Sequence, residues 1–518
     1  MRRVHSRDTT PEKIFRKALW KNGVRYRTCS NDLPGKPDIV IRSRKLAIFV
    51  DGDFWHGGQW ARRHLSSLES QFTQSKSRDY WLAKIRKNIE RDCHSTADLL
   101  SQGWTVLRFW ESEIKRNLGR CVSLAVEVYK NGAKPNAYSF APQKTVAEFF
   151  AGIGLIRLAL ERRGWKIVYA NDRDLAKRDM YLGHFQEEPH LFDCEDIHRI
   201  SAGTIPQVSL ATASFPCNDI SLAGSRSGLK GRESSAFWGF IRIVHEMGDR
   251  RPPLILLENV VGFMSSNKGE DLRAALLALN RLGYFVDMFV VDASWFVPQS
   301  RQRLFVIGQI HNESFNCEDK IGSNIAEDRF RPKKLIKFIH NNNDILWSIG
   351  SLPDVEPSKS RLADVVEDLP DNAPEWWSQR RTDYLVSQMN PKHKSLVIEM
   401  VSGDKWSYGT VFRRTRTGKS MAEIRIDGIA GCLRTPRGGS ARQILFKAGH
   451  GKFVARLLTP LECARLMGVD DYNFSVSKNK ALFGFGDAVC VPAIEWIATH
   501  RLNPLVTEMI RGCPLSLK

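Results

Sequence analysis

A cysteine, a glutamate and two arginines stand in a fixed order in the middle of this chain. Cys217 follows Pro216, Glu258 begins Glu258-Asn259-Val260, and Arg301 and Arg303 lie in the stretch 299–303. A thiolate is a nucleophile, a carboxyl group can donate a proton, and arginines bind anions in a fixed geometry. These are the groups that methylation of a cytosine ring at carbon 5 requires.

Carbon 5 of cytosine is a poor nucleophile as long as the ring is aromatic. Addition of a thiolate at carbon 6 converts the ring to an enamine, and a proton at N3 makes that addition favourable. Carbon 5 then takes a methyl group from S-adenosylmethionine, and elimination of the thiol together with the proton on carbon 5 restores the ring. We expect burial to keep Glu258 protonated, and Arg301 and Arg303 to hold the base and its phosphates. The base must leave the duplex for this reaction.

Glycines and acids around the cysteine could hold such a cofactor. Gly152 and Gly154 lie between an expected strand and an expected helix, where they leave room for a ligand against the backbone. Asp172 ends the second strand, where an acid accepts hydrogen bonds from ribose hydroxyls, and Asp196 follows the third and could bind an adenine amino group. Taken singly, such glycines are equally typical of tight packing, and a lone cysteine is most often a small buried side chain.

A second group of polar side chains lies near the N terminus. Glu12 is followed by Asp38 at the start of one expected strand, by Asp51 at the end of its neighbour, and by His56. Carboxylates at adjacent strand ends can bind Mg²⁺, which activates a water molecule against a phosphodiester. His56 could protonate the leaving oxygen or position the water. Two acids on a hairpin are equally often solvated turn residues.

The expected elements alternate as in an α/β protein. The first part predicts helices from Thr10 and over 80–100 and strands at 37–40, 46–50 and 105–110; the second predicts strands at 145–150, 167–171, 208–213 and 254–257 and a helix at 154–163. Short apolar strands that alternate with helices favour a doubly wound sheet in the second part. The pattern dissolves from about residue 312 to 455, where basic and polar residues dominate.

Size and charge restrict the class of protein. The chain has 518 residues, 42% of them hydrophobic, which is enough for two or three domains, and a net charge of +20, which is typical of nucleic-acid-binding proteins. Its 10 cysteines form no CxxC pairs, no hydrophobic signal core opens the chain, and no apolar run approaches the ~20 residues that span a bilayer. We expect a protein of the cytoplasm or nucleoid with double-stranded DNA, and no membrane, as its partner.

Residues 145 to about 505 resemble the bacterial C5-cytosine DNA methyltransferases. The family's motifs occur in order, at 149–154, 215–217, 258–260, 299–303, 456–468 and 485–489. The resemblance implies S-adenosylmethionine as the cofactor, Cys217 as the nucleophile, Glu258 as the N3 acid, and active-site roles for Arg301 and Arg303. It implies that the cofactor is lined by Phe150, Asp172, Asp196, Pro216 and Val489.

The same resemblance implies a contact with the cofactor at Asp487, where the family usually has Asn. The variable block before residue 456 would be a target-recognition domain. Within that block, the resemblance implies that Thr435, Arg437, Gly438 and Gly439 lie near the DNA.

Residues 1 to about 130 resemble the very short patch repair endonucleases, which nick beside a T·G mismatch. The matching stretches are 33–41, 49–57, 79–92 and 104–111. The resemblance implies that Asp38 and the carbonyl of Val50 bind magnesium, with Glu12 and His56 acting through bound water. It implies that Phe54, Trp55 and Trp81 intercalate at the mismatch, although the first two could equally be core residues. The fold it implies is the PD-(D/E)xK nuclease type.

Two features of this part depart from that family. The family's structural zinc needs Cys and His at the positions of Asp53, Gly58, Trp60 and Ser112, which do not make a ligand set, so we predict no zinc. The family's Thr-His pair is Val50-Asp51 here, which keeps a backbone carbonyl and replaces one histidine with an acid.

Together these observations predict an α/β chain in which a PD-(D/E)xK-type nuclease precedes a Rossmann-like methyltransferase with a small target-recognition domain. The expected boundaries are 1–130 for the nuclease, 131–143 for a linker, 144–325 for the catalytic domain, 326–480 for target recognition, and 481–518 for a segment that returns to the catalytic domain. The favoured interpretation is a bifunctional enzyme that methylates cytosine and nicks the mismatches arising from methylation, with mismatch-repair proteins as candidate partners. The alternatives are a restriction–modification fusion that cuts unmethylated sites, and a methyltransferase with a non-catalytic DNA-binding module.

Overall fold

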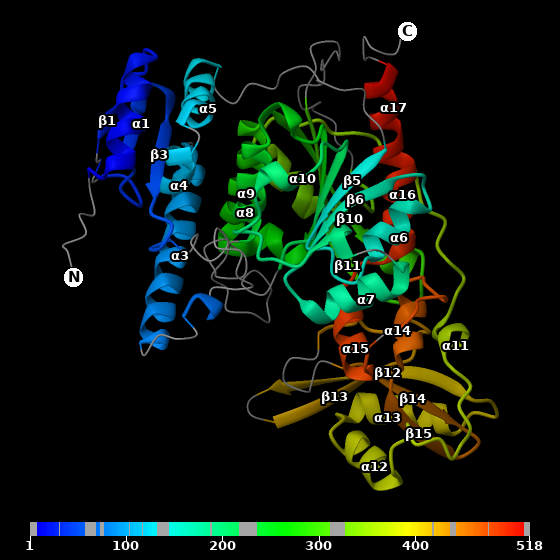
Figure 1. The fold of residues 1–518 in the computed structure, drawn as a ribbon. Coiled ribbons are helices and arrows are strands. Elements are labelled where there is room, and N and C mark those ends of the chain that lie inside the picture. The colour runs from blue at the N-terminus through cyan, green and yellow to red at the C-terminus, as the bar shows by residue number, and fades with distance from the viewer. Residues whose placement is uncertain are drawn as a thin grey trace.

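The computed structural model contains three β-sheets with helices packed around them (Figure 1). It describes residues 8–28, 30, 32–56, 69–72, 77–102, 104–116, 118–131, 144–186, 189–216, 236–310, 327–416, 419–435, 442–474 and 476–511. Cys217 and the stretch 437–439, which the sequence assigns to the active site and to DNA contact, lie outside the described residues. Described residues precede and follow each of these two segments.

The N-terminal sheet has the strand order β1-β2-β3-β4, in which β3 and β4 run parallel and the other pairs antiparallel. The helix expected from Thr10 is present, and its first turn is capped by Thr9, whose hydroxyl accepts from the Glu12 amide. The apolar faces of the helices and the sheet form a core around Phe15, Ile48 and Phe109 and a second, smaller cluster around Phe49 and Trp104. The elements are α1 Thr10–Lys21, β1 Arg27–Thr28, β2 Ile39–Ile41, β3 Leu46–Asp51, α3 Arg78–Ser101, β4 Thr105–Trp110, α4 Glu111–Arg116 and α5 Leu118–Asn131.

The central sheet has seven strands in the order β10-β11-β9-β8-β5-β6-β7. The strands from β9 to β7 are parallel, and β11 is antiparallel to both its neighbours. Its elements are β5 Thr145–Phe149, α6 Leu155–Glu161, β6 Lys166–Asn171, α7 Leu175–Phe185, β7 Phe192–Asp193, β8 Leu210–Ala213, α8 Ala236–Glu246, β9 Leu254–Val260, α9 Glu270–Arg281, β10 Tyr284–Asp292 and β11 Gln302–Ile310. The predicted doubly wound sheet is therefore confirmed.

The strand order reverses between β5 and β8, because the chain adds β6 and β7 on one side of β5 and then returns to add β8 and β9 on the other. Ligands of open α/β sheets bind at such a switch point, outside the carboxyl ends of the strands. The loop after β5 carries Gly152, and the segment after β8 carries Pro216. The start of β11 reaches the same edge, since Arg303 lies opposite Val260 at the end of β9.

The third sheet lies in the region where the sequence shows no alternating pattern. Its four strands are all antiparallel, in the order β13-β12-β14-β15, and they cover a core around Val411, Phe446 and Met400. Strands that form hairpins with one solvated face need few apolar residues, which explains why periodicity did not reveal them. The elements are α10 Lys333–Asn341, α11 Leu362–Val365, α12 Gln379–Ser387, α13 Pro391–Val401, β12 Ser407–Arg416, β13 Lys419–Arg425, β14 Ile444–Gly449 and β15 Lys452–Leu457.

The C-terminal helices join the third sheet to the central one (Figure 1). They are α14 Pro460–Leu466, α15 Lys478–Asp487, α16 Val491–Ile497 and α17 Asn503–Arg511, with a π-helical turn at Ala498–Leu502. A fully buried ion pair, Arg456 Nη2 to Glu462 Oε1 at 2.5 Å, fixes the end of β15 to α14. At the other side of the central sheet, α3 of the N-terminal part packs against α8 and α9.

Among the described residues, one helical run, Lys478–Met509, is long and apolar enough to cross a membrane. The sequence analysis did not anticipate a run of this length. Most of its apolar stretch is buried, and Phe485, Ile494 and Ile497 belong to the core of the central sheet. A buried core helix passes the same test of length and composition, so this run is weak evidence for a membrane span.

Candidate active sites

The loop after β5 has the shape of a ligand-binding turn. Phe150, Gly152 and Gly154 all have positive φ angles, of 56°, 58° and 81°. A Cβ on Gly154 would lie 2.5 Å from Phe185 and 2.9 Å from Tyr181, so packing against α7 requires glycine there. A Cβ on Gly152 would meet no atom closer than 3.9 Å, so the space beside this glycine is open. The two glycines therefore have different roles: Gly154 serves packing, and Gly152 leaves room for a ligand.

Two acids flank that open space. The Asp172 carboxylate accepts hydrogen bonds from the amides of Gly152 (3.0 Å) and Asp174 (2.9 Å), which fix it beside the loop. Asp196 accepts from the His198 amide at 3.0 Å and lies 3.8 Å from Arg173. Burial alone would raise the Asp196 pKa, but the neighbouring His198 and Arg173 hold it below its ordinary value. Open space beside Gly152, with Asp172 fixed next to it, and a second acid at Asp196 fit a cofactor with ribose hydroxyls and an amino group.

Pro216 is the last described residue before Cys217. The segment that leads to it is held from the neighbouring strand, because the Asn259 side-chain amide donates to the carbonyl of Phe215 at 3.2 Å. Phe215 itself is buried against Phe237 and Phe263. Asn259 follows Glu258 directly, so one strand end fixes the chain before the cysteine and carries the carboxyl group.

Glu258 and Arg303 contact each other, in an arrangement that the sequence does not specify. Arg303 Nε lies 2.9 Å from Glu258 Oε1, and both side chains are largely buried. The contact follows from the register, since Phe305 pairs with Glu258 and Arg303 lies two residues away on the same strand. The sequence analysis placed Arg303 on the substrate and expected desolvation alone to act on Glu258. In the structure a cation also contacts this carboxyl group.

Arg301 makes contacts with the backbone that the sequence does not specify. Its guanidinium donates to the carbonyls of Leu433 (2.8 Å), Gly486 (3.3 Å) and Ala488, so it binds protein backbone rather than pointing to open space. The side chain is almost fully buried, and a buried guanidinium must satisfy its donors. Arg301 therefore ties the segment after β13 and the end of α15 to the central sheet.

The end of α15 departs from the expected picture in a similar way. Asp487 Oδ2 accepts from Lys177 Nζ at 2.8 Å, and Asp487 Oδ1 accepts from the Thr435 hydroxyl. Val489, which the resemblance assigns to the cofactor, is buried in the core of the central sheet. Thr435 is the last described residue before the predicted DNA-contacting stretch, and it contacts Asp487 in this structure.

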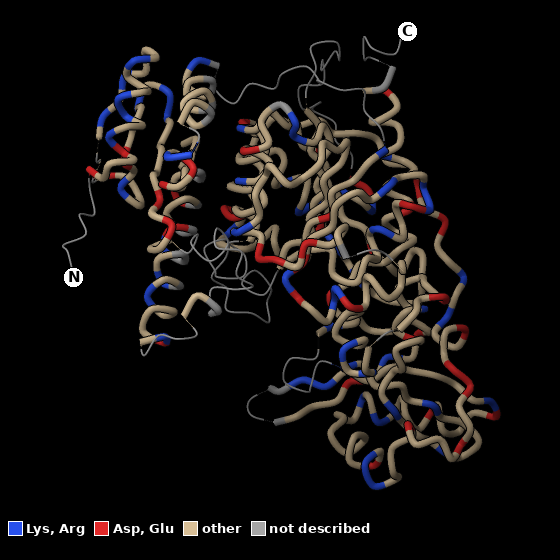
Figure 2. The backbone as a smooth tube through the Cα atoms, in the orientation of Figure 1, with Lys and Arg blue, Asp and Glu red and all other residues tan. Residues whose placement is uncertain are grey.

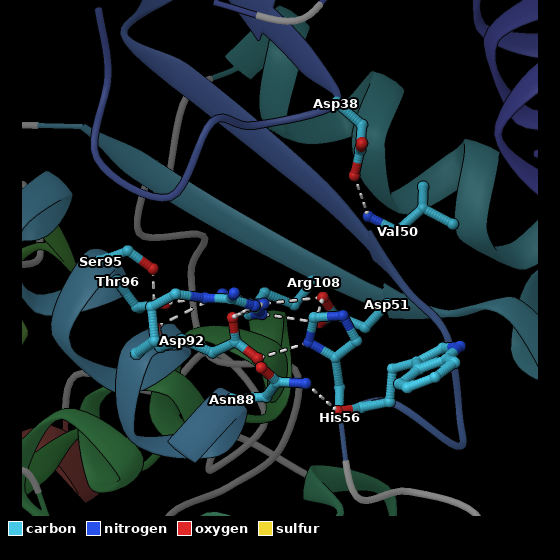
Figure 3. A network of polar contacts seen from close by, with 11 residues as sticks. Asp38, Val50, Asp51, His56, Asn88, Asp92, Ser95, Thr96 and Arg108 are labelled. Atoms are coloured by element: carbon cyan, nitrogen blue, oxygen red, sulfur yellow. Dashed lines mark hydrogen bonds and ion pairs between the residues drawn. The ribbon is translucent and has the colours of Figure 1, made fainter. Parts of the chain in front are cut away.

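In the N-terminal part, Asp38 has the surroundings of a cation ligand (Figure 3). Its carboxylate accepts from the Val50 amide at 2.8 Å. Burial and the charges of Glu12 and Asp51 raise the pKa of Asp38 to about 6 against this hydrogen bond. Glu12 is buried, with its carboxylate bound by Thr9 (2.8 Å) and Arg16 (3.2 Å). Asp38 therefore has two further carboxylates near it, and carboxylate oxygens are the ligands that Mg²⁺ prefers, so the residues fit Mg²⁺.

His56 lies in a network of charged side chains beside this group (Figure 3). Its Nδ1 contacts the Asp92 carboxylate and lies 3.6 Å from Asp51 Oδ1. Burial alone would lower the His56 pKa, but Asp92 and Asp51 raise it above its ordinary value. Because a carboxylate can only accept, Nδ1 carries the proton in the neutral ring and Nε2 is left for the substrate.

Arg108 completes this network. Its Nε and Nη2 bind the two oxygens of Asp51, each at 2.7 Å, and its Nη1 donates to Thr96 Oγ1 at 3.1 Å. The ligand atoms of Asp51, His56 and Asp92 lie within 4.8 Å of one another, as in a metal site. Since a guanidinium already neutralises Asp51, we assign the cluster to proton transfer rather than to a metal.

The sequence analysis missed Asp92 and Arg108. Both lie in stretches that match the nuclease family, at 79–92 and 104–111. Asp92 is on α3 and Arg108 on β4, far from His56 in sequence, so no local pattern links them. The signal that could have pointed to them is their residue type. One is an acid and the other an arginine, and both lie in stretches that match the family of the predicted histidine.

Three aromatic residues that the sequence assigns to intercalation do come together. The ring centroids are 5.1 Å apart for Phe54 and Trp55, 5.4 Å for Phe54 and Trp81, and 5.9 Å for Trp55 and Trp81. All three side chains are partly exposed. An aromatic cluster with an accessible face can stack on a base pair.

The zinc positions of the related nucleases hold a different contact here. Ser112 donates to Asp53 through its hydroxyl (2.6 Å) and its amide (3.1 Å). Asp53 is buried, and the other two positions are Gly58 and Trp60, whose side chains bind no metal. The set therefore does not fit zinc.

Positively charged side chains gather on two parts of the molecule. Figure 2 shows Lys and Arg along α1 and on β12 and β13 of the third sheet. On the latter hairpin these include Arg413, Arg414 and Lys419. Such clusters bind phosphates without reading sequence.

Comparison with known proteins gives two separate matches. Residues 144–502 match the family model described as C-5 cytosine-specific DNA methylase, and residues 1–62 match that of DNA mismatch endonuclease Vsr. The chain is 30% identical over 358 residues to the Type II methyltransferase M.HhaI of Haemophilus parahaemolyticus, covering 68% of this chain and 92% of that protein. It is 41% identical over 116 residues to the Type II nicking enzyme V.NmeDIP of Neisseria meningitidis serogroup C, covering 22% of this chain and 74% of that protein.

Among solved structures, the crystal structure of S. pombe Dnmt2 methyltransferase is similar, with 18% sequence identity and a TM-score of 0.46. The match covers 70% of this chain and 98% of that one.

Proposed function

Because the chain belongs to the C-5 cytosine-specific DNA methylase family and carries a part of the Vsr mismatch endonuclease family at its N terminus, we propose that it is a bifunctional DNA enzyme. One part transfers a methyl group from S-adenosylmethionine to carbon 5 of cytosine in a specific duplex sequence. The other nicks DNA at T·G mismatches, which arise when 5-methylcytosine deaminates. The observation that carries the proposal is that described members of each set, Glu258 with Arg303 and Asp51 with His56, lie together at the strand ends of their own sheet.

In the methyltransferase part, S-adenosylmethionine supplies the electrophilic methyl group when it is bound. Gly152 leaves room for it against the backbone, and Asp172 accepts hydrogen bonds from its ribose. The Cys217 thiolate attacks carbon 6 of the flipped cytosine, while Glu258 holds a proton at N3. Arg303 orients the Glu258 carboxyl group through the ion pair described above and can extend to the base.

In the nuclease part, Mg²⁺ would be held by Asp38 and the carbonyl of Val50, and when bound it lowers the pKa of a water molecule and offsets charge on the phosphate. His56 moves a proton through Nε2, and Asp92 orients the imidazole from Nδ1. Phe54, Trp55 and Trp81 stack at the mismatch. A small sheet with acids at the ends of β2 and β3 fits the PD-(D/E)xK plan.

Fusion of the two activities has a physical advantage. Both parts must visit the same DNA sequence, and a tether raises the local concentration of the second part once the first is bound. The partner of the proposed activities is double-stranded DNA, which suits the net charge of +20.

The experiment that tests this proposal has two steps. The sequence methylated by the purified chain is first determined with labelled S-adenosylmethionine on a duplex library. Nicking with Mg²⁺ is then measured on duplexes with a central T·G pair in random flanks, beside the matched duplexes. We expect nicks only at T·G, within flanks that match the methylated sequence.

The other outcomes favour the alternative functions. Cutting of matched, unmethylated duplexes would instead indicate a restriction–modification enzyme. Methylation without nicking on either substrate would reduce the N-terminal part to a DNA-binding module.

A further inference from the structure

Three polar side chains of the central sheet have a buried atom without a hydrogen-bond partner among the described residues. They belong to Glu148 on β5, Thr212 on β8 and Ser214 just after β8, and the atoms are Oε1, Oγ1 and Oγ respectively. A buried polar atom that lacks a protein partner is usually paired with an ordered water molecule. The methyl-transfer chemistry described above uses none of these three side chains.

The register of the sheet places the three side chains in one row. Glu148 lies opposite Thr212 in the parallel pair of β5 and β8, so their side chains share one face of the sheet. Neighbouring strands are about 4.8 Å apart, a spacing at which polar side chains contact each other directly or through one water molecule. Ser214 follows two residues after Thr212, on the same face, because side chains alternate along a strand.

The row continues to Glu258 on β9. The pairing of β8 with β9 extends past the last residue of β8, because the Asn259 side chain donates to the carbonyl of Phe215 at 3.2 Å. By that register Ser214 lies beside Glu258, on the face that also carries Thr212. A row of polar groups therefore leads from the interior of the sheet to the carboxyl group of the proposed N3 acid.

The inner end of the row is a protonated carboxyl group at neutral pH. Burial raises the pKa of Glu148 from 4.5 to about 8, against the effects of Tyr181 and Arg157, and the charge of Glu161 raises it too. Tyr472 also faces this carboxyl group and stays neutral, because burial raises the pKa of its hydroxyl. Since Glu148 Oε2 accepts from the Tyr181 hydroxyl at 3.2 Å, Oε1 is the oxygen that carries the proton toward the row.

The outer end of the row needs a proton during methyl transfer. The ion pair of Glu258 with Arg303, at 2.9 Å, uses the carboxylate form of the glutamate. Addition of the thiol to the ring uses the protonated form, which holds a proton at N3. Hydroxyl groups and water can carry a proton to a largely buried carboxylate, because each of them both accepts and donates.

Resting on the proposed methyl transfer, we propose that Glu148 supplies, along this row, the proton that Glu258 holds at N3. Glu148 releases a proton from Oε1, each hydroxyl or water takes up one proton and passes on its own, and Glu258 gains one. The number of protons is unchanged. After elimination the proton returns from N3 to Glu258 and along the row to Glu148. The residues of the row are positioning residues, because they act through Glu258 without contact with the substrate.

The test follows the single-turnover rate of methyl transfer on both sides of pH 8. The full-length chain is mixed beforehand with duplex DNA that carries the methylated sequence, and S-adenosylmethionine starts the reaction. In wild type the rate should fall as the pH rises through about 8, because Glu148 then loses the proton that the row carries. Glu148→Gln should be slower at neutral pH and should not show this fall.

Removal of either hydroxyl should have the same effect. Thr212→Val and Ser214→Ala should each lower the rate at neutral pH by at least about tenfold, because proton transfer by positioned groups contributes roughly 10²–10⁴-fold. Both should also lose the fall near pH 8, whereas the KM for DNA should not change. Thr212→Ser keeps the hydroxyl and should keep the wild-type rate and pH profile.

Ser209→Ala is the matched control for Ser214→Ala. The Ser209 hydroxyl is also buried without a partner among the described residues, but it lies at the opposite end of β8 from Ser214, so this variant should behave as wild type. The pH profile separates loss of the proton path from a distorted site, because distortion lowers the rate at every pH.

A wild-type pH profile in Thr212→Val or in Glu148→Gln would overturn the proposal, and so would equal losses of rate in Ser209→Ala and Ser214→Ala. These results would leave the proposed methyl transfer in place. A wild-type chain that transfers no methyl group at any pH would instead overturn the proposed function itself.

Discussion

The two candidate sites of this chain are built on different supports. The methyltransferase site lies at the carboxyl ends of five parallel strands whose two faces are covered by large apolar clusters. The nuclease site lies on four short strands over a small core, and charged side chains occupy much of its interior. In the first, backbone geometry places the functional groups. In the second, a network of ion pairs does so.

This difference explains how each site departs from its family. The methyltransferase motifs are intact apart from Asp487, whereas the nuclease part has replaced a histidine and the whole zinc set. The replacements that the structure describes have partners: Asp51 binds Arg108, Asp53 binds Ser112, and Asp487 binds Lys177. In a site that depends on side-chain pairs, both members of a pair change together. A change of one member alone would leave a buried charge without a partner, which is costly.

The largest expected effect is the separation of the two activities. Cys217→Ser should abolish methyl transfer, because a hydroxyl is a far weaker nucleophile than a thiolate, and should leave nicking and cofactor binding unchanged. His56→Ala should lower nicking by roughly 10²–10⁴-fold and leave methylation unchanged, because it removes the proton-transfer group. The separation is measured as the rate of each reaction on one duplex that carries both a methylation site and a T·G pair.

The wild-type chain and the double variant serve as controls. If either single variant impaired both reactions, the two halves would act as one unit, and the comparison of independent sites would fail.

A smaller effect is expected from the Asp51–Arg108 pair. Arg108→Met leaves the Asp51 carboxylate buried beside other acids, which should destabilise the N-terminal part by about 3–5 kcal/mol. Hydrogen exchange of the peptides over β3 and β4 reports the loss, with the peptides of β5 and β8 as an internal standard. Arg44→Met, at an exposed arginine of the same part, is the matched control.

Asp51→Asn combined with Arg108→Met should recover part of the loss, because the stranded charge is gone. Equal exchange in Arg108→Met and in Arg44→Met would show that the pair does not support the site.

The sequence predicted the methyltransferase part more completely than the nuclease part for a physical reason. Strand ends follow from apolar runs, and Glu258 and Asp172 each come directly after or at the end of such a run, so their convergence follows from the parallel sheet. The backbone contacts of Arg301 were not predicted, because they depend on carbonyls more than 130 residues away, at Leu433 and Ala488. No local pattern encodes that contact.

In the nuclease part, the sequence located Asp38 and His56 but not the residues that orient them. Asp92 reaches His56 from a long helix, and Arg108 reaches Asp51 from the neighbouring strand. The third sheet was missed for a different reason, since hairpin strands such as β12 carry few apolar residues in a mostly basic stretch. Periodicity detects burial, whereas these features rest on polar contacts.

The methyltransferase core also contains a buried titratable group, which sharpens the comparison. Glu148 on β5 is fully buried, with the Tyr181 hydroxyl 3.2 Å from its Oε2. Burial raises its pKa from 4.5 to about 8. The neutral form is favoured in the folded state, so its contribution to stability is full below pH 4.5 and is lost as pH rises toward 8.

The glutamine in Glu148→Gln is neutral at every pH, so this variant should not lose stability as the pH rises. The stability of wild type relative to the variant should fall with pH by at most about 1.4 kcal/mol per pH unit between these values. Thermal denaturation at a series of pH values measures the difference. Parallel curves for the two proteins would mean that Glu148 does not take up a proton on folding.

The smallest effect is expected at the zinc positions of the related nucleases, where Ser112 and Asp53 are joined by hydrogen bonds. Ser112→Ala removes the hydroxyl that donates to Asp53 and leaves the amide bond in place, so it should cost about 1–2 kcal/mol. Asp53 is followed directly by Phe54, Trp55 and His56. Nicking should therefore fall more than the loss of folding stability alone explains, while methylation stays unchanged. Ser101→Ala, at the end of α3 where no zinc position lies, is the control for loss of a serine hydroxyl.

Metal analysis of both variants and of wild type should find no bound zinc. Nicking in Mg²⁺ should also be insensitive to a zinc-selective chelator. Stoichiometric zinc in the wild-type protein would break the comparison, because the nuclease part would then have kept its family's metal with a different set of ligands.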